Sequence, residues 1–151
     1  MNLEVLSSRE SMTLCRAAAN LVLSRFSSMA RRTEKGDRSL SQLFMELAGD
    51  MERNLVEIFQ LEGQGRLPEA FEEETGQKVA RGFLPSLSKG SDGVHLDRES
   101  GFYVVECILE DLSAFYGALV RQSCDEKSRE LLLRWKLAIG ARLEFLHRVV
   151  L

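Results

Sequence analysis

The stretch SLSQLFMELAGDMERNLVEIFQL, at positions 39–61, constrains the fold of this chain most strongly. With 3.6 residues per turn, its apolar side chains fall on one stripe, and its acidic residues fall off that stripe. The stripe comprises Leu40, Phe44, Leu47, Met51, Asn54, Ile58 and Leu61. Asn54 is the exception, because it places an amide inside an otherwise apolar seam. The stretch therefore predicts an amphipathic helix that packs in a core and carries one inward polar group.

Three other segments, 9–32, 98–122 and 126–149, repeat this helical periodicity. Their seams include Cys15, Ala19 and Phe26, then Leu109 and Tyr116, then Trp135, Ile139, Arg142 and Leu146. Arg142 is a second polar residue on a core line. Strand-forming runs are short, and the chain has only two prolines. The composition and the periodicity together predict an all-α protein.

The segment 62–97 interrupts this pattern, because it holds both prolines and lacks a sustained helical period. We expect a connection there, with at most a turn or two of helix in EAFEEETG at 69–76. In a four-helix bundle, a link of this length carries the chain from one end to the other. The helices at 39–61 and 98–122 are therefore predicted to be parallel, within one domain spanning 1–151.

The two halves of the chain also resemble each other. Sliding 126–149 over 39–61 without a gap places Leu132 on Phe44, Trp135 on Leu47, Ile139 on Met51 and Arg142 on Asn54. A repeated helical hairpin with a long middle connection predicts a four-helix bundle made of two similar halves.

Two motifs resemble the rubrerythrin-type branch of the ferritin-like superfamily: AFYGAL at 114–119 and LFMELAGDMERNL at 43–55. The resemblance implies a ferritin-like four-helix bundle. In that family the first and third helices each supply one inward Glu, and the second and fourth each supply Glu-x-x-His. These side chains together hold two iron ions.

The resemblance also implies that this ligand set is lost. The six ligand positions of the family correspond to Ala19, Met51, Asn54, Leu109, Ile139 and Arg142. None is a carboxylate or an imidazole, and the thioether of Met51 is a weak ligand for iron. The sequence therefore predicts no cofactor, with iron implied by the family resemblance alone. It favours a non-catalytic interaction or structural protein that has lost the usual di-iron site.

Two alternatives remain open. The first is a rubrerythrin-like, iron-binding oxidoreductase that uses the unusual ligands Glu52, Glu110, Glu144 and His147. Glu144 and His147 do spell Glu-x-x-His, although Glu144 lies about 140° around its helix from Ile139.

The second alternative is a small polar or anionic ligand held by Asn54 and Arg142. A buried guanidinium without partners is costly. The simpler interpretation is that Arg142 reaches Asn54, backbone carbonyls or a carboxylate at the edge of the bundle.

The remaining features predict the setting and the partners. The net charge is −3, and no apolar run is long enough to span a membrane, so we expect a cytoplasmic protein that binds neither nucleic acid nor membranes. Cys15, Cys107 and Cys124 form no C-x-x-C pair and are interpreted as apolar fillers. The helices at 9–32 and 98–122 are apolar beyond one seam. We therefore expect a homodimer through helix faces, with part of this surface covered by 62–97, and the sequence does not identify another partner protein.

Overall fold

The computed structural model of the chain describes residues 8–63, 73–88, 97–122 and 125–150. These residues form α1 (Ser8–Thr33), α2 (Arg38–Gly63), α3 (Glu73–Phe83), the 3-10 helix η2 (Pro85–Ser88), α4 (Arg98–Gln122) and α5 (Glu126–Val150). The described ranges contain no strand, which confirms the predicted all-α class. The four long helices correspond to the segments predicted at 9–32, 39–61, 98–122 and 126–149.

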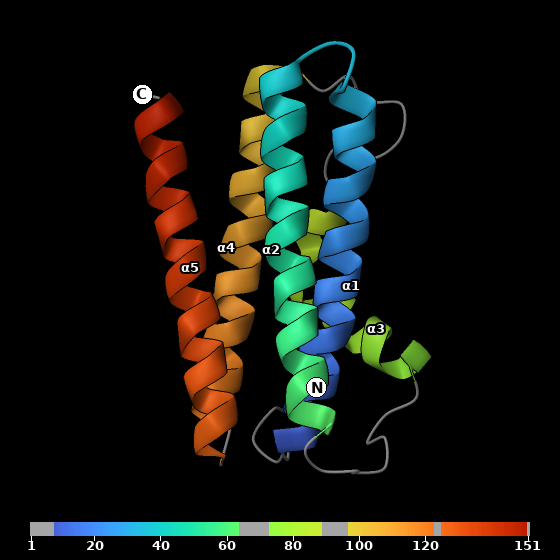
Figure 1. Ribbon diagram of the computed structural model, residues 1–151, viewed down its shortest axis with the longest axis vertical. Helices are drawn as coiled ribbons and strands as arrows, with labels where there is room; N and C mark the ends of the chain where they lie inside the picture. The colour runs from blue at the N-terminus through green and yellow to red at the C-terminus, as the bar shows by residue number, and fades with distance from the viewer. Residues whose placement is uncertain (1–7, 64–72, 89–96, 123–124, 151) are drawn as a thin grey trace.

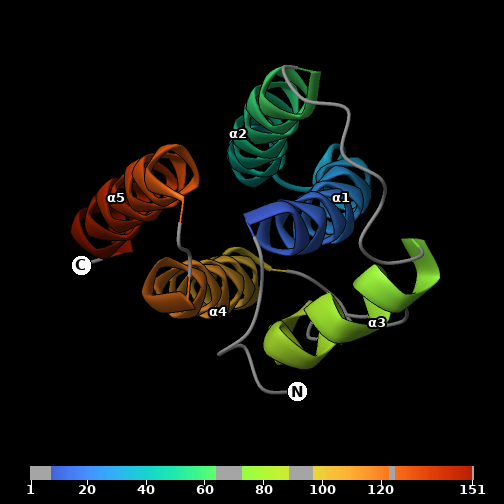
Figure 2. The same ribbon diagram turned by 90° about the horizontal axis from the view of Figure 1, so that it is seen from below.

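The four long helices stand side by side along the longest axis of the molecule (Figure 1). α1 and α2 form one antiparallel hairpin, and α4 and α5 form another, with α2 and α4 running in the same direction. Seen from below, these four helices occupy the corners of a quadrilateral, and α3 lies outside it next to α1 (Figure 2).

The connection predicted at 62–97, with a turn or two of helix at 69–76, holds more helix than expected, because its central part folds as α3 and η2. The reason is that inward-facing residues recur there at helical spacing over a short stretch. Gly76 and Ala80 are buried, and Val79 and Phe83 pack against the core. The ring of Phe83 lies 5.4 Å from that of Phe115 on α4. α3 therefore has one apolar face of its own, and this face packs against α1 and α4.

This packing covers much of the apolar surface that was predicted to extend beyond one seam. Leu14 on α1 and Val104 on α4 are buried, and Leu84 and Leu87 of the crossover join the same core. Positions 64–72 and 89–96 of the segment that was expected to cover this surface lie outside the described residues.

A carboxylate ties the two hairpins together at one end of the bundle. Asp37 accepts a hydrogen bond from the backbone N–H of Leu40 at 3.1 Å, as a cap of α2. Its two carboxylate oxygens also accept hydrogen bonds from Arg98, at 2.9 and 3.0 Å. The Arg98 guanidinium, followed by the Leu40 amide, lowers the pKa of Asp37 below its usual value. The start of α4 is thereby held beside the start of α2.

Two glycines in the long helices provide a matched test of this packing. A Cβ atom added at Gly101 would lie 2.6 Å from Cδ2 and 3.2 Å from Cγ of the buried Leu40, whereas one added at Gly140 would meet nothing within 4 Å. Gly101→Ala is therefore expected to lower the free energy of unfolding by about 1–2 kcal/mol through overpacking. Gly140→Ala is expected to raise it by about 0.5–1 kcal/mol, because alanine favours a helix.

Urea unfolding followed by far-ultraviolet circular dichroism measures both changes. Equal stabilisation by the two alanines would mean that α4 does not pack closely on Leu40.

The large apolar side chains that stay exposed lie mainly on α2 and α5. They are Met45, Val56 and Phe59 on α2, Tyr103 on α4, and Leu133, Leu137 and Phe145 on α5. None of the helices in the described ranges combines the length and the apolar character that a membrane span requires.

Candidate functional site

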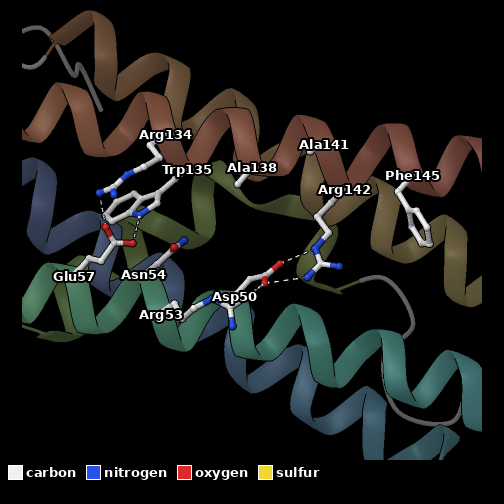
Figure 3. Close-up of a pocket in the computed structure, with 10 residues that line it drawn as sticks. All are labelled: Asp50, Arg53, Asn54, Glu57, Arg134, Trp135, Ala138, Ala141, Arg142 and Phe145. Carbon is white, nitrogen blue, oxygen red and sulfur yellow. Dashed lines mark hydrogen bonds and ion pairs between the residues drawn. The ribbon is translucent and has the colours of Figure 1, made fainter.

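α5 is attached very differently to its two neighbours. Its backbone packs closely along α4 but hardly approaches α2, and the end-on view shows the two helices apart (Figure 2). Between α2 and α5 lies an open cleft of about 550 Å³, shown in Figure 3. The cleft is lined by Asp50, Arg53, Asn54, Glu57, Arg134, Trp135, Ala138, Ala141, Arg142 and Phe145.

Arg142 bridges this cleft from α5 to α2. Its Nε and Nη2 atoms donate to the two carboxylate oxygens of Asp50, at 2.9 and 3.0 Å, and Nη1 lies 3.5 Å from Glu46. Asp50 also pairs with Arg53 one turn along α2. The hydrogen bonds that Arg142 donates to Asp50 raise the pKa of Arg142 despite its partial burial, so the guanidinium is charged at any physiological pH.

This geometry decides among the predicted partners of Arg142. The side chain is 30% exposed and reaches a carboxylate at the edge of the bundle, not Asn54. The prediction that Arg142 lies on a core line therefore needs correction. The aliphatic part of its side chain starts beside the core, and its guanidinium lies at the opening of the cleft. A bidentate arginine-carboxylate pair at a half-buried site satisfies both charges.

A second polar tie crosses the same cleft about two helical turns away. Glu57 on α2 accepts hydrogen bonds from Arg134 and, at 3.3 Å, from the indole N–H of Trp135 (Figure 3). The Trp135 ring itself is buried, 5.6 Å from the ring of Tyr116 on α4. Trp135 thus joins α5 to α4 by packing and to α2 by a hydrogen bond.

Asp50, Glu57 and Arg134 were missed as site residues, although the sequence holds a signal for them. On α2 the carboxylates Asp50 and Glu57 are seven positions apart, and on α5 Arg134 and Arg142 are eight apart. In antiparallel helices the first residue of one pair lies opposite the second residue of the other, so that Asp50 meets Arg142 and Glu57 meets Arg134. Opposite charges at matched spacing on the two halves therefore indicate a polar interface between α2 and α5.

Asn54 lies on the wall of the cleft and faces inward. Its side-chain amide donates to the hydroxyl of Tyr116 at 3.4 Å. Tyr116 is fully buried, and burial is the main reason that its pKa lies above the ordinary value. Nearby Cys15 adds to this rise, whereas the hydrogen bond from Asn54 opposes it. Burial also raises the pKa of the Cys15 thiol. Both groups stay neutral, so neither forms an activated nucleophile.

Five of the six positions that the sequence resemblance aligns with metal ligands meet beneath this cleft. Met51, Asn54, Leu109, Ile139 and Arg142 line a cavity of about 30 Å³. This volume is comparable to the share of one water molecule in the liquid, roughly 30 Å³. Met51, Leu109 and Ile139 are buried, and so is Ala19, the sixth position, on α1.

The unusual ligands considered above do not gather. Glu144 is exposed and pairs with Arg148 at 3.6 Å, whereas His147 lies 3.3 Å from Glu106 on α4. Glu52 and Glu110 are also exposed. Among the residues that the structure describes, no three His, Cys, Asp or Glu side chains form a group that could hold a metal ion.

Comparison of the chain with protein-family models, with curated proteins and with solved structures found no match. The function is therefore inferred from the geometry of α2, α4 and α5.

Proposed function

We propose that this chain is a ferritin-like, rubrerythrin-like helical protein that has lost the usual di-iron site and serves a non-catalytic interaction or structural role. One observation carries the proposal. At the centre of the molecule, Met51, Leu109 and Ile139 are buried at positions where the family resemblance expects glutamates. These residues leave a cavity of only about 30 Å³ beside Asn54 and Arg142.

The chemistry of the donors opposes a di-iron centre. Two iron ions require several anionic oxygens and imidazole nitrogens that converge on them. The nearest carboxylate, Asp50, already accepts two hydrogen bonds from Arg142, at 2.9 and 3.0 Å. The Arg142 guanidinium adds a positive charge beside the cavity. The residues present therefore do not fit a pair of iron ions, and we derive no redox step for this protein.

Iron loading tests the proposal directly. The protein, purified without chelators and then given ferrous iron in air, is expected to retain far less than one iron per chain after gel filtration. It should also develop no oxo-bridge absorption in the near ultraviolet. The matched control is the double variant Glu144→Gln/His147→Gln. Near-stoichiometric iron in the wild type that this variant loses would overturn the proposal in favour of an iron-binding oxidoreductase with unusual ligands.

A second candidate, a small polar ligand in the α2/α5 cleft, has one observation in its favour. The cleft of about 550 Å³ combines polar groups with the apolar surfaces of Trp135 and Phe145. Its arginines, however, are paired with Asp50, Glu57 and Glu46, so it presents no surplus positive charge to an anion. Titration with inorganic phosphate, followed by the fluorescence of Trp135, tests this candidate. Saturable quenching that Arg142→Leu abolishes would support it.

A further inference from the structure

Among the side chains that the structure describes, the outer part of α5 exposes three large apolar ones, as many as α2 does. Leu137 is 75% exposed, Phe145 is 54% exposed and Leu133 is 43% exposed. α5 lies at the edge of the molecule (Figure 2). Leu137 does not line the α2/α5 cleft, whereas Phe145 lies at the border between the cleft and the outer face. A contiguous apolar patch rimmed by polar residues, unlike a single exposed side chain, commonly marks a contact surface.

The residues along this face have the spacing of a coiled-coil seam. They are Glu130, Arg134, Leu137, Ala141, Glu144 and Arg148, separated by four, three, four, three and four positions. All six residues are exposed. This alternation keeps every member on one line of the helix, as in the first and fourth positions of a heptad. The seam is therefore able to face a single partner helix over about five turns.

We propose that the occupant of this face is α5 of a second copy of the chain, packed antiparallel about a twofold axis near Ile139. In such a pair, seam residues whose numbers add up to 278 face each other. The resulting layers are Glu130 with Arg148, Arg134 with Glu144, and Leu137 with Ala141, each formed twice. Both charged layers join opposite charges, and the central layers are apolar.

The same seam disfavours the parallel arrangement. Parallel helices in register would place each residue against its own copy, so that Glu130, Arg134, Glu144 and Arg148 would all meet like charges. Interfaces obtain specificity from such repulsion as well as from attraction. The charge order along α5 therefore selects the antiparallel pair.

Small residues beside the seam allow the two helices to approach closely. Ala138 and Gly140 flank its centre, and a Cβ atom added at Gly140 would meet nothing within 4 Å. Leu133 and Phe145 lie farther out along the flanks, where they would cover the apolar centre. The proposed contact surface thus has small residues at its centre, large apolar residues around them and charged residues at its ends.

The ion pairs that these residues already form within one copy of the chain do not prevent them from pairing with the second copy. Glu144 and Arg148 pair along the helix at 3.6 Å with side chains 74% and 78% exposed, and such pairs are weak. Arg134 binds Glu57 across the cleft, but its guanidinium has further N–H donors for a carboxylate of the second copy. The hydrogen bond between Arg134 and Glu57 would also hold the Arg134 side chain in a fixed orientation toward the second copy.

The apolar outer face of α2 is the rival surface, and its charge order suits self-pairing less well. Met45, Glu52, Val56 and Phe59 share one face there and are exposed. An antiparallel pairing that places Met45 opposite Phe59 would bring Glu52 against its own copy. Like charges at the centre of a contact oppose association.

Sedimentation velocity from about 1 μM to about 1 mM protein tests the proposal. The wild type is expected to pass from monomer to dimer with rising concentration, and Leu137→Glu should raise the dimer Kd at least tenfold. The matched control is Val56→Glu on α2, because both positions have an arginine three residues earlier. A dimer that survives Leu137→Glu, or one that only Val56→Glu dissociates, would overturn the proposal, as would a monomer at every concentration.

Charge reversal tests the register. Glu130→Arg and Arg148→Glu should each raise the Kd roughly tenfold, because each places like charges in two layers. The double variant Glu130→Arg/Arg148→Glu restores opposite charges and should return the Kd to within about threefold of the wild type. Failure of this rescue, with unchanged circular dichroism, would rule out the antiparallel register. The outcome is independent of iron binding, so the dimer and the proposed loss of the di-iron site are tested separately.

Discussion

Met51→Glu is expected to destabilise the protein by on the order of 4 kcal/mol at neutral pH. Met51 is 2% exposed, and its neighbours around the small cavity include Leu47, Leu109 and Ile139. A glutamate there would lose its hydration. The nearby Arg142 could compensate only by giving up its bidentate contact with Asp50. The substitution thus introduces a carboxylate of the kind that the ferritin-like family uses, without the partners that make it tolerable.

The pH dependence of this variant has a definite sign. Burial raises the pKa of a carboxyl group above its unfolded value of about 4.3, because the charged form is disfavoured. The variant is therefore expected to lose little stability below about pH 4, where its carboxyl is protonated in both states. The loss should grow as the pH rises from there through the raised folded-state pKa. Urea unfolding at several pH values, relative to the wild type, measures this profile.

Met45→Glu is the matched control on the same helix. Met45 is 63% exposed, so a carboxylate there stays in water and should change the free energy of unfolding by no more than about 0.5 kcal/mol at any pH. If Met51→Glu proved as stable as Met45→Glu, the new carboxylate would have found water or a cation in the interior. The proposal of a closed apolar centre would then be wrong.

The long helices were predictable from the sequence because each carries a complete apolar seam. The stripe through Leu40, Leu47 and Ile58 specifies both a helix and its buried face, and these residues are buried in the structure. α3 was harder to foresee, because its apolar face rests on only a few residues, among them Val79 and Phe83. Such a short helix becomes stable only when α1 and α4 cover it, and this tertiary contact leaves little trace in local periodicity.

The site shows a similar division. Asn54 and Arg142 stood out because polar residues on an apolar seam require partners, and the structure provides those partners. Which residues become the partners depends on the distance between α5 and α2. This distance cannot be read from the sequence pattern of either helix alone. Asp50 and Glu57 were assigned to the solvent side, yet they lie at the flank where long side chains from α5 reach them. Amphipathic patterns give the direction of a side chain but not the spacing between hairpins.

This spacing gives α5 one packed neighbour and one polar neighbour. α5 packs closely against α4, whereas its contact with α2 consists of paired charges around an open cleft. Half-exposed ion pairs contribute little stability, so the attachment of α5 depends on the few large side chains that it buries. Among the side chains of α5 that the structure describes, Trp135 is the largest buried one, and it also donates a hydrogen bond across to α2.

Trp135→Ala is therefore expected to lower the free energy of unfolding by about 3–5 kcal/mol. The change removes a ring that is 3% exposed and lies 5.6 Å from Tyr116, and it opens the small central cavity to the cleft. Trp135→Phe separates the two roles, because it keeps a ring against Tyr116 and removes the N–H that Glu57 accepts. It should cost less than the alanine, about 1–2 kcal/mol, including the smaller ring.

Phe59→Ala is the matched control, since it removes a ring that is 59% exposed on α2 and should change stability by no more than about 0.5 kcal/mol. Thermal and urea unfolding, followed by circular dichroism, compare the three variants without relying on tryptophan fluorescence. Equal small losses for Trp135→Ala and Phe59→Ala would mean that α5 is held mainly by its charged ties. In that case 1 M salt, which screens exposed ion pairs, should destabilise the wild type strongly. If α5 is held by packing, the same salt should leave stability nearly unchanged.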